Sequence, residues 1–291
     1  MKALIDADIL RYEIGFGAET GIRDFVENGK ELDVKPSMTY IEHLLTERVY
    51  SILGKVEADD FCLYLTEGEN MRDKIATIKP YKGQRKEDKP YQFDNMTQFI
   101  KDSLPHKISK YGLEADDMMA MDQISSLRRS AENGREGHKG DSTVICSRDK
   151  DLMQVPGWHY SWGCGKQKEA GLFYSSPSTV GDIQLEGTKL TGHGLMFFYA
   201  QLLMGDSTDN IAGVPKVGPK KAYALLTSVP TEGMLNAIAG EYGRVYGDGW
   251  KDAMTENGQL LWMVRRLSSD CTPEMYYPGT MREESYHGQS L

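Results

Sequence analysis

The chain has 291 residues, 40% of them hydrophobic, and a formal net charge of −9 at pH 7, so it can bury a large core in one domain or in two lobes. No apolar run is long enough to cross a bilayer, and the charge at Asp6 comes too early for a secretory signal peptide. The four cysteines contain no CxxC pair, which argues against a disulfide scaffold or a zinc site. We therefore expect a cytoplasmic protein with reduced thiols and no membrane partner.

Short apolar runs alternate with helical patterns through the first two thirds of the chain. Buried strands are predicted at residues 2–5, 61–65 and 143–146, with shorter ones near 159–162 and 172–174. Apolar spacing predicts helices at 9–16, 36–53, 95–104 and 116–127, and the polar stretches 17–35 and 126–141 are expected to be loops. From residue 192 the pattern is helical, with helices expected at 195–204, 220–226, 234–242 and 258–267. This order predicts an α/β fold with a parallel sheet, followed by a helical C-terminal lobe.

Acidic residues stand at the ends of several predicted elements. Asp6, Glu67, Asp149 and Asp151 follow apolar strands, Glu114, Asp116 and Asp117 open a helix, and Asp206 and Asp209 follow one. The carboxyl ends of parallel strands meet at one edge of a sheet, where ligands bind. Oxygen ligands crowded at such an edge suit Mg²⁺ or Mn²⁺, and two such ions can polarise a phosphodiester and lower the pKa of a bound water.

A lone aspartate at the end of an element is more often a turn former or a helix cap than a metal ligand. Five separate acidic groups at such positions are not explained in that way. Asp8 stands close to Asp6 and either supports the metal ligands from behind or caps the first helix. The net charge of −9 disfavours a nucleic-acid partner, unless many carboxylates are committed to metal ions whose positive charge the count omits.

Three motifs carry a resemblance to a known family. They are Gly112-Leu113-Glu114-Ala115-Asp116-Asp117, Ser147-Arg148-Asp149-Lys150-Asp151 and Met204-Gly205-Asp206-Ser207-Thr208-Asp209-Asn210, the last continuing through a hairpin to Gly218. Over residues 4–267 the chain resembles the 5′ nucleases: phage 5′–3′ exonucleases and flap endonucleases, ribonuclease H of T-even phages, and the 5′-nuclease domain of bacterial DNA polymerase I. Phage exonucleases of the T-odd type look most similar, because they also combine a compact first loop with a short spacing from Glu67 to Arg72.

The resemblance implies a fold and a domain organisation. We expect a PIN-like 5′-nuclease fold, with a mostly parallel sheet flanked by helices over residues 1–190 and a helical arch at about residues 72–110. Residues 191–291 would form a helical DNA-binding lobe that contains a helix–three-turn–helix motif at 205–226.

The resemblance also implies that the carboxylates hold two ions, either Mg²⁺ or Mn²⁺. The first ion would lie near Asp6, Glu67, Glu114 and Asp116, and the second near Asp149, Asp151, Asp206 and Asp209, with Asp117 beside both. This partition of the ligands is a hypothesis.

The densest basic cluster comprises Arg72 and residues 79–86, with Tyr81 inside it. Arg and Lys can neutralise phosphates and a Tyr ring can stack on a base, although the charges alone favour a solvated loop. The resemblance places this segment at the entrance of the arch, through which a single 5′ strand passes. It implies that Lys82 steers and stabilises the scissile phosphate, that Arg72 and Arg85 are supporting phosphate contacts, and that Tyr81 stacks on a base.

Gly213 and Gly218 bracket a tight hairpin that contains Lys216, and Pro219 opens the next helix ahead of Lys220 and Lys221. Backbone N–H groups and a helix start form an anion site without base readout. Pro at the first helical position with two lysines behind it favours phosphate binding over a plain helical turn. By resemblance, this motif grips the DNA duplex, and its hairpin carbonyls hold a monovalent ion such as K⁺.

The chain departs from the family at two positions that are basic in a number of relatives. Glu13 stands seven residues after Asp6, with Arg11 nearby as a possible substitute, and Gln201 stands five residues before Asp206. These departures concern the handling of the 5′ end and not the metal chemistry.

We therefore expect a metal-dependent 5′–3′ exonuclease or structure-specific flap endonuclease, acting at or near 5′ ends of DNA or RNA primers in replication, repair or recombination. Its products would carry 5′-phosphate and 3′-hydroxyl groups. We expect a monomer in a bacterial or phage-infected cell, and RNA–DNA hybrids and replication proteins are open as further partners.

Two other functions fit the motifs less well. A haloacid-dehalogenase-type phosphatase would use Asp6 and Asp8 in covalent aspartyl chemistry, with Asp206 and Asp209 at its metal, but it leaves the Glu114 motif and the hairpin unexplained. A catalytically inactive relative that binds DNA junctions would lack some of the carboxylates, whereas every acidic group is present here.

Overall fold

The structure is a computed structural model that describes residues 1–23, 35–85, 88–135, 137–140 and 142–278. Part of the predicted loop at 17–35, Lys86 of the basic cluster, and the last residues of the expected C-terminal lobe lie outside these ranges. None of the helices in the described part is both long and apolar enough to cross a membrane.

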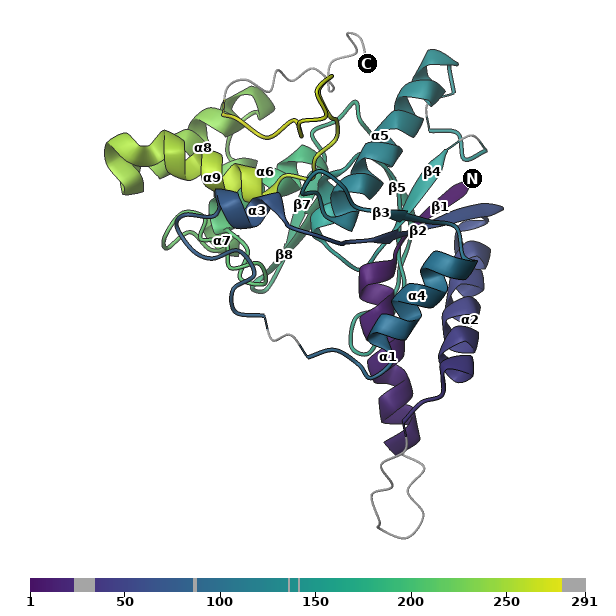
Figure 1. The fold of residues 1–291 in the computed structure, drawn as a ribbon. Coiled ribbons are helices and arrows are strands. Elements are labelled where there is room, and N and C mark those ends of the chain that lie inside the picture. The colour runs from purple at the N-terminus through teal and green to yellow at the C-terminus, as the bar shows by residue number, and fades with distance from the viewer. Residues whose placement is uncertain (24–34, 86–87, 136, 141, 279–291) are drawn as a thin grey trace.

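A six-stranded sheet forms the centre of the molecule (Figure 1). Its strands are β1 (Lys2–Asp6), β2 (Asp60–Leu65), β3 (His106–Ile108), β4 (Thr143–Cys146), β5 (Gly157–Ser161) and β6 (Ala170–Ser175). They lie in the order β3-β2-β1-β4-β5-β6, and all neighbours are parallel except the β5–β6 pair. Leu4 of β1 is paired with Cys62 on one side and Ile145 on the other, so the carboxyl ends of these three strands lie together.

Helices cover both faces of the sheet, because its central strands are apolar on both sides. Ala3 and Ile5 pack with α1 (Ala7–Arg23), α2 (Met38–Val56) and α4 (Phe93–Ser103), whereas Leu4 packs with α5 (Ala115–Glu132) on the other face. Figure 1 shows α5 on one side of the sheet and the other three helices on the opposite side.

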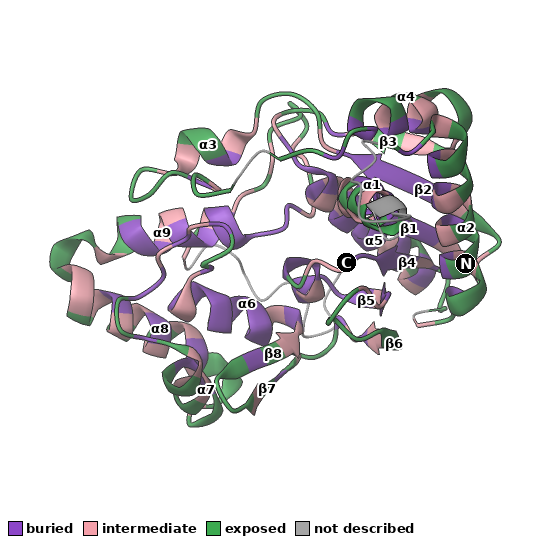
Figure 2. Cartoon of the chain, turned by 90° about the horizontal axis from the view of Figure 1, so that it is seen from below, coloured by how far each residue is buried: buried purple, intermediate pink, exposed green. Residues whose placement is uncertain are grey.

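A second body of the molecule is mainly helical. It contains a hairpin of β7 (Asp182–Glu186) and β8 (Lys189–His193), then α6 (Gly194–Met204), α7 (Pro219–Thr227), α8 (Thr231–Tyr246) and α9 (Trp250–Leu261). Short 3-10 turns lie at η2 (Asp151–Gln154) and η3 (Gly247–Gly249). Helix α6 is apolar nearly all round and is buried among the other elements of this body, as Figure 2 shows.

The predicted fold class is confirmed, with a mostly parallel sheet and a helical C-terminal part. The predicted loops were wrong at two helix ends, because α1 continues through residues 17–23 and α5 continues to Glu132. β3 and the β7–β8 hairpin were not predicted. The helix expected at 258–267 ends at Leu261, because the N–H groups of Met263 and Val264 bond to the side chains of Gln154 and Asp117 instead of continuing the helix.

The expected helical arch is not helical in its described middle part. After α3 (Met71–Ile75), residues 76–85 and 88–92 form turns and irregular chain up to the start of α4. Pro80 and Pro90 lack the N–H groups that a continuous helix would need. The segment therefore crosses between the two bodies as a loop (Figure 1).

Candidate active site

Asp6 ends β1 at the carboxyl edge of the sheet and is almost fully buried. Its Oδ1 accepts a hydrogen bond from the backbone N of Ile9 (3.0 Å), and its Oδ2 accepts one from Ser147 Oγ (2.7 Å). Asp8, on the first turn of α1, accepts from the backbone N of Thr66 (3.1 Å) and pairs with Arg11 (2.5 Å). Asp8 therefore ties α1 to the chain that follows β2, immediately beside Asp6.

Asp6, Asp116 and Asp149 are three carboxylates that lack an ion-pair partner among the described residues. Burial and the neighbouring Asp8 raise the pKa of Asp6 to about 7. Burial also raises the pKa of Asp116 well above its usual range, with further repulsion from Asp6 and Asp149, and it raises that of Asp149. None of the three carboxylates forms an ion pair within the described ranges of the chain. They therefore share one low-dielectric region in which a positive charge would be strongly favoured.

The carboxylates of a second set each face a basic side chain. Arg85 contacts Asp209 (2.5 Å), and the Lys150 ammonium contacts both Asp206 and Asp151. Asp151 also accepts a hydrogen bond from Gln201 Nε2 (2.5 Å). The neutral Gln201, which stands five residues before Asp206, therefore fixes the position of the Asp151 carboxylate. Burial and Asp149 nonetheless raise the pKa of Asp151 to about 7.

Glu114 lies where these groups meet. It contacts Lys82 Nζ, Arg72 Nη1 (3.2 Å) and the Tyr81 hydroxyl (2.9 Å). Burial alone would raise the pKa of Glu114, but Arg72 and Lys82 hold it at about 2. Tyr81 lies also 3.1 Å from Asp209 Oδ2, so it links the acidic start of α5 to the loop after α6.

The donor set fits hard divalent cations in chemistry and charge, since it consists of carboxylates with too few basic partners. As the side chains stand, no group of three or more His, Cys, Asp or Glu residues in the described part of the chain forms a site that could hold a metal ion. The ammonium groups of Lys82 and Lys150 and the guanidinium groups of Arg72 and Arg85 lie among the carboxylates instead. Binding of an ion would therefore require some of these side chains to move.

Two further predicted metal ligands each have a basic partner of their own. Glu67 forms an ion pair with Lys101 of α4, and no hydrogen bond or ion pair among the described residues joins it to the other acids. Asp117 is fully buried and binds Arg72 through both oxygens (2.7 and 2.8 Å). Its oxygens also accept from the backbone N of Glu114 (3.0 Å) and of Val264 (2.9 Å).

The structure corrects two of the expected nucleic-acid contacts. Arg72 is fully buried with its guanidinium bound to protein groups, so it does not reach a phosphate. Tyr81 is only 7% exposed and packs in the core of the helical body, so its ring is not free to stack on a base. Lys82 and Arg85 do lie among the carboxylates, where their backbone segment is fixed by a bond from Lys82 N to the Asp209 carbonyl (3.0 Å).

The hairpin between α6 and α7 has the expected form, with Pro219 at the first position of α7. Lys216, Gly218, Lys220 and Lys221 are exposed, but Gly213 is buried. Gly213 has a φ of +59° and faces Gly205 so closely that a Cβ would lie 2.1 Å from the Gly205 nitrogen. Gly213 thus shapes the hairpin, and the lysines are the groups that face solvent.

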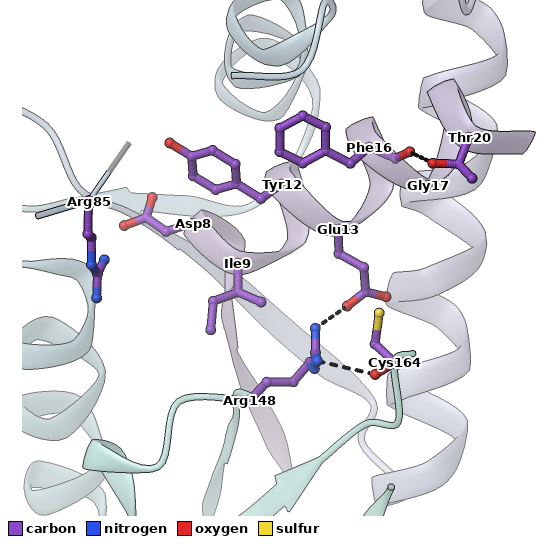
Figure 3. A pocket seen from close by; sticks show the side chains of 10 residues that line it. All are labelled: Asp8, Ile9, Tyr12, Glu13, Phe16, Gly17, Thr20, Arg85, Arg148 and Cys164. Carbon is purple, nitrogen blue, oxygen red and sulfur yellow. Dashed lines mark hydrogen bonds and ion pairs between the residues drawn. The ribbon is translucent and has the colours of Figure 1, made fainter. Parts of the chain in front are cut away.

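A groove of about 660 Å³ runs along α1 beside Asp8 (Figure 3). The rings of Tyr12 and Phe16 line it, 38% and 40% exposed, and Arg85 lies near Asp8 at one end. Sequence analysis missed this groove, although the spacing of four between the two rings on the helix after Asp6 was a usable signal.

Glu13 lies on the same helix and its charge is compensated inside the protein. It forms an ion pair with Arg48 (2.8 Å) and accepts hydrogen bonds from Arg148 (3.3 Å) and Trp162 Nε1 (2.6 Å). Arg11 is buried against Thr97 and Asp8, so it does not supply an exposed basic group in place of the residue that relatives carry.

The fold is shared with solved structures of a phage T5 protein. The T5 D15 protein co-crystallised with metal ions superposes with a TM-score of 0.55 over 88% of each chain at 18% identity. The T5 5′-exonuclease with bound zinc gives a TM-score of 0.52 over 90% of each chain, also at 18% identity. At this identity the likeness establishes the fold.

Sequence comparison leads to the same superfamily. DNA polymerase I of Bacillus subtilis is 31% identical over 199 residues, which are 68% of this chain and 21% of that protein. The 5′-3′ exonuclease of Buchnera aphidicola from Acyrthosiphon pisum is 30% identical over 115 residues, 40% of this chain and 33% of that protein. The chain thus spans about a fifth of the length of the polymerase, and no family model matches it. The expected resemblance to the 5′ nucleases is confirmed in sequence and in fold.

Proposed function

We propose that this protein is a metal-dependent 5′ nuclease that hydrolyses phosphodiester bonds at or near 5′ ends of DNA and leaves 5′-phosphate products. The observation that carries this proposal is the cluster of Asp6, Asp116 and Asp149, whose repulsion and burial raise their pKa values. Such an excess of carboxylate charge at the carboxyl edge of a parallel sheet favours hard cations.

Two ions are proposed, Mg²⁺ or Mn²⁺. Asp6, Glu114 and Asp116 would hold the first, with Glu67 if it exchanges Lys101 for the ion; Asp149, Asp151, Asp206 and Asp209 would hold the second. When bound, such ions supply Lewis-acid activation of the phosphodiester and of the attacking water. The carboxylates fix the position of that chemistry, and their burial strengthens it by excluding bulk water.

Lys82 is proposed to bind the scissile phosphate. Its ammonium group now contacts Glu114 and lies 4.8 Å from the centre of the Tyr81 ring. A phosphate that takes over this ammonium would be stabilised as charge develops on its oxygens. Once Lys82 binds the phosphate, it would no longer contact Glu114, and the Glu114 carboxylate would be free to bind the metal ion.

The groove along α1 is proposed to receive the single 5′ strand. Exposed aromatic rings beside basic groups bind unpaired bases and their phosphates without sequence preference. Arg85 lines this groove and also pairs with Asp209, so one side chain connects the groove to the carboxylates. The exposed Lys216, Lys220 and Lys221 would grip the adjoining duplex, and the hairpin carbonyls could take a K⁺ ion.

The test is cleavage of a 5′-labelled flap, a blunt duplex, a plain single strand and an RNA primer on DNA, each with Mg²⁺, Mn²⁺ or EDTA. Asp149→Asn is the matched inactive variant, since it keeps the oxygen that accepts from Asp151 N. A short 5′ fragment released from the flap, only with metal and only by the wild type, would establish a flap endonuclease. Mononucleotides from the duplex would establish an exonuclease.

No cleavage of any substrate with either metal would refute the proposed function. p-Nitrophenyl phosphate serves as a further substrate, because metal-dependent turnover that Asp6→Asn abolishes would point to the phosphatase alternative instead. Phosphate content of the released 5′ ends, measured by ligation, tests the proposed products.

A further inference from the structure

Arg72 joins parts of the chain that are far apart in sequence. Its Nε donates to the carbonyl of Leu260 (3.1 Å) and its Nη2 donates to the carbonyl of Trp262 (2.7 Å), at the end of α9. Its three remaining hydrogen bonds go to the acidic start of α5, two to Asp117 and one to Glu114. All five N–H donors of the guanidinium are therefore used, and the side chain has no exposed surface.

Asp117 completes the connection. Each of its oxygens accepts one bond from Arg72 and one from a backbone N–H, that of Val264 on one oxygen and that of Glu114 on the other. A carboxylate offers about four such acceptor positions, and all four are occupied. Asp117 thus binds the first turn of α5 to the chain after α9 and has no oxygen position left over.

Glu114 is held by this pair in two ways. Its backbone N–H is fixed by Asp117, and its Oε2 is fixed by Arg72, so that Oε1 is the oxygen that meets Lys82. The orientation of Glu114 therefore depends on a guanidinium that is itself anchored on Leu260 and Trp262.

We propose that Arg72 is a positioning residue: through Asp117 it locks Glu114 onto the segment after α9, so that the C-terminal body sets the geometry of the candidate metal centre. This inference rests on the proposed metal-dependent function. According to this inference, Arg72 and Asp117 form a structural pair, and neither residue contacts DNA or the metal ion.

The test compares Arg72→Lys with Arg265→Met in the full-length protein. A lysine keeps the charge but cannot form a bidentate pair with Asp117 and reach two carbonyls as well. Arg265 is the matched control, because it lies on the same segment and bonds to the Gln154 carbonyl (2.9 Å) without touching a carboxylate. The first measurement is Mn²⁺ affinity, from the electron paramagnetic resonance of free Mn²⁺; the second is kcat and KM on the flap substrate.

Arg72→Lys should weaken Mn²⁺ binding and lower kcat, each on the order of 10–100-fold, while KM for DNA stays the same; Arg265→Met should leave Mn²⁺ affinity unchanged. An unchanged Mn²⁺ affinity with a raised KM would show that Arg72 contacts phosphate and would overturn the inference. If the wild type binds Mn²⁺ but cleaves no substrate, the proposed function fails, and the Mn²⁺ comparison still decides the role of Arg72.

Hydrogen exchange in the wild type gives a test that does not depend on a variant folding. The amides of Glu114 and Val264 both bond to Asp117, so they should show the same high protection factor, and Mn²⁺ should raise both together. Fast exchange at Val264 beside slow exchange at Glu114, or an effect of Mn²⁺ on Glu114 alone, would overturn the inference.

Discussion

Replacement of Asp6 by asparagine should stabilise the metal-free protein while abolishing its activity. Asn keeps the shape of the side chain, so Oδ1 can still accept from Ile9 N, and the amide can donate to Ser147 Oγ. What the variant loses is a buried charge that lies near Asp8 and Asp149.

The structure sets the size of this effect. The pKa of Asp6 rises from 3.8 to about 7 through burial and repulsion, which corresponds to a ceiling of about 4 kcal/mol in the free energy of unfolding. An amide also loses hydration when buried, so we expect a net gain on the order of 1–3 kcal/mol at pH 8. In a chain of 291 residues this raises Tm by about 2–5 °C.

The gain should depend on pH in a defined direction. Because the folded state binds the Asp6 proton more tightly than the unfolded state does, wild-type stability falls as the pH rises from about 4 to about 7 and then levels off. The advantage of Asp6→Asn therefore grows from pH 5 to pH 8. Mg²⁺ at about a thousand times its Kd should reverse the order of stability, since it adds about 4.1 kcal/mol to a protein that binds it.

The assay is thermal unfolding followed by circular dichroism at pH 5 and pH 8, in EDTA and in Mg²⁺. Asp122→Asn is the control, because Asp122 is paired with Lys107 (2.5 Å), so loss of its charge should give no stabilisation. A lower Tm for Asp6→Asn than for wild type in EDTA at pH 8, or an equal rise of both in Mg²⁺, would refute the reasoning about the uncompensated cluster.

Three further substitutions test the proposed DNA contacts. Lys82→Met should lower kcat on the flap substrate on the order of 100-fold with little change in KM, because its charge acts on the transition state; a change in KM alone would contradict this. Lys220→Ala should weaken duplex binding and reduce the salt slope of the affinity by about 1, as measured by fluorescence anisotropy at several salt concentrations. Tyr12→Ala should cost about 1–3 kcal/mol in binding of a 5′ flap but leave the affinity for blunt duplex unchanged, if a base stacks on this ring.

The sheet and its acidic edge could be predicted because they depend on local patterns. An apolar run such as Lys2–Asp6 identifies a buried strand, and parallel pairing then brings the end of β1 beside the ends of β2 and β4. The β7–β8 hairpin also had a local signal, since Ile183 and Leu185 alternate with polar residues ahead of Gly187, whose φ is +61°. That signal was missed because the segment borders a strongly helical region.

The role of Arg72 could not be predicted, because it depends on contacts across 188 and 190 residues of sequence. Nothing near position 72 distinguishes a basic residue that will bind phosphate from one that will be buried against a carboxylate. The prediction that Tyr81 stacks on a base was wrong for the same reason, since its hydrogen-bond partners Glu114 and Asp209 belong to other elements. Such side chains are assigned only when the tertiary packing is known.

The net charge of −9 also has a different meaning in three dimensions. Several acids contribute little to the field outside the protein, because Asp117 is neutralised by Arg72 and Asp209 is in contact with Arg85. The hairpin that would meet the duplex instead exposes Lys216, Lys220 and Lys221. Whether a nucleic acid can bind thus depends on which charges are exposed at the binding surface. Charges that are paired inside the protein, and the net charge of the whole chain, do not decide it.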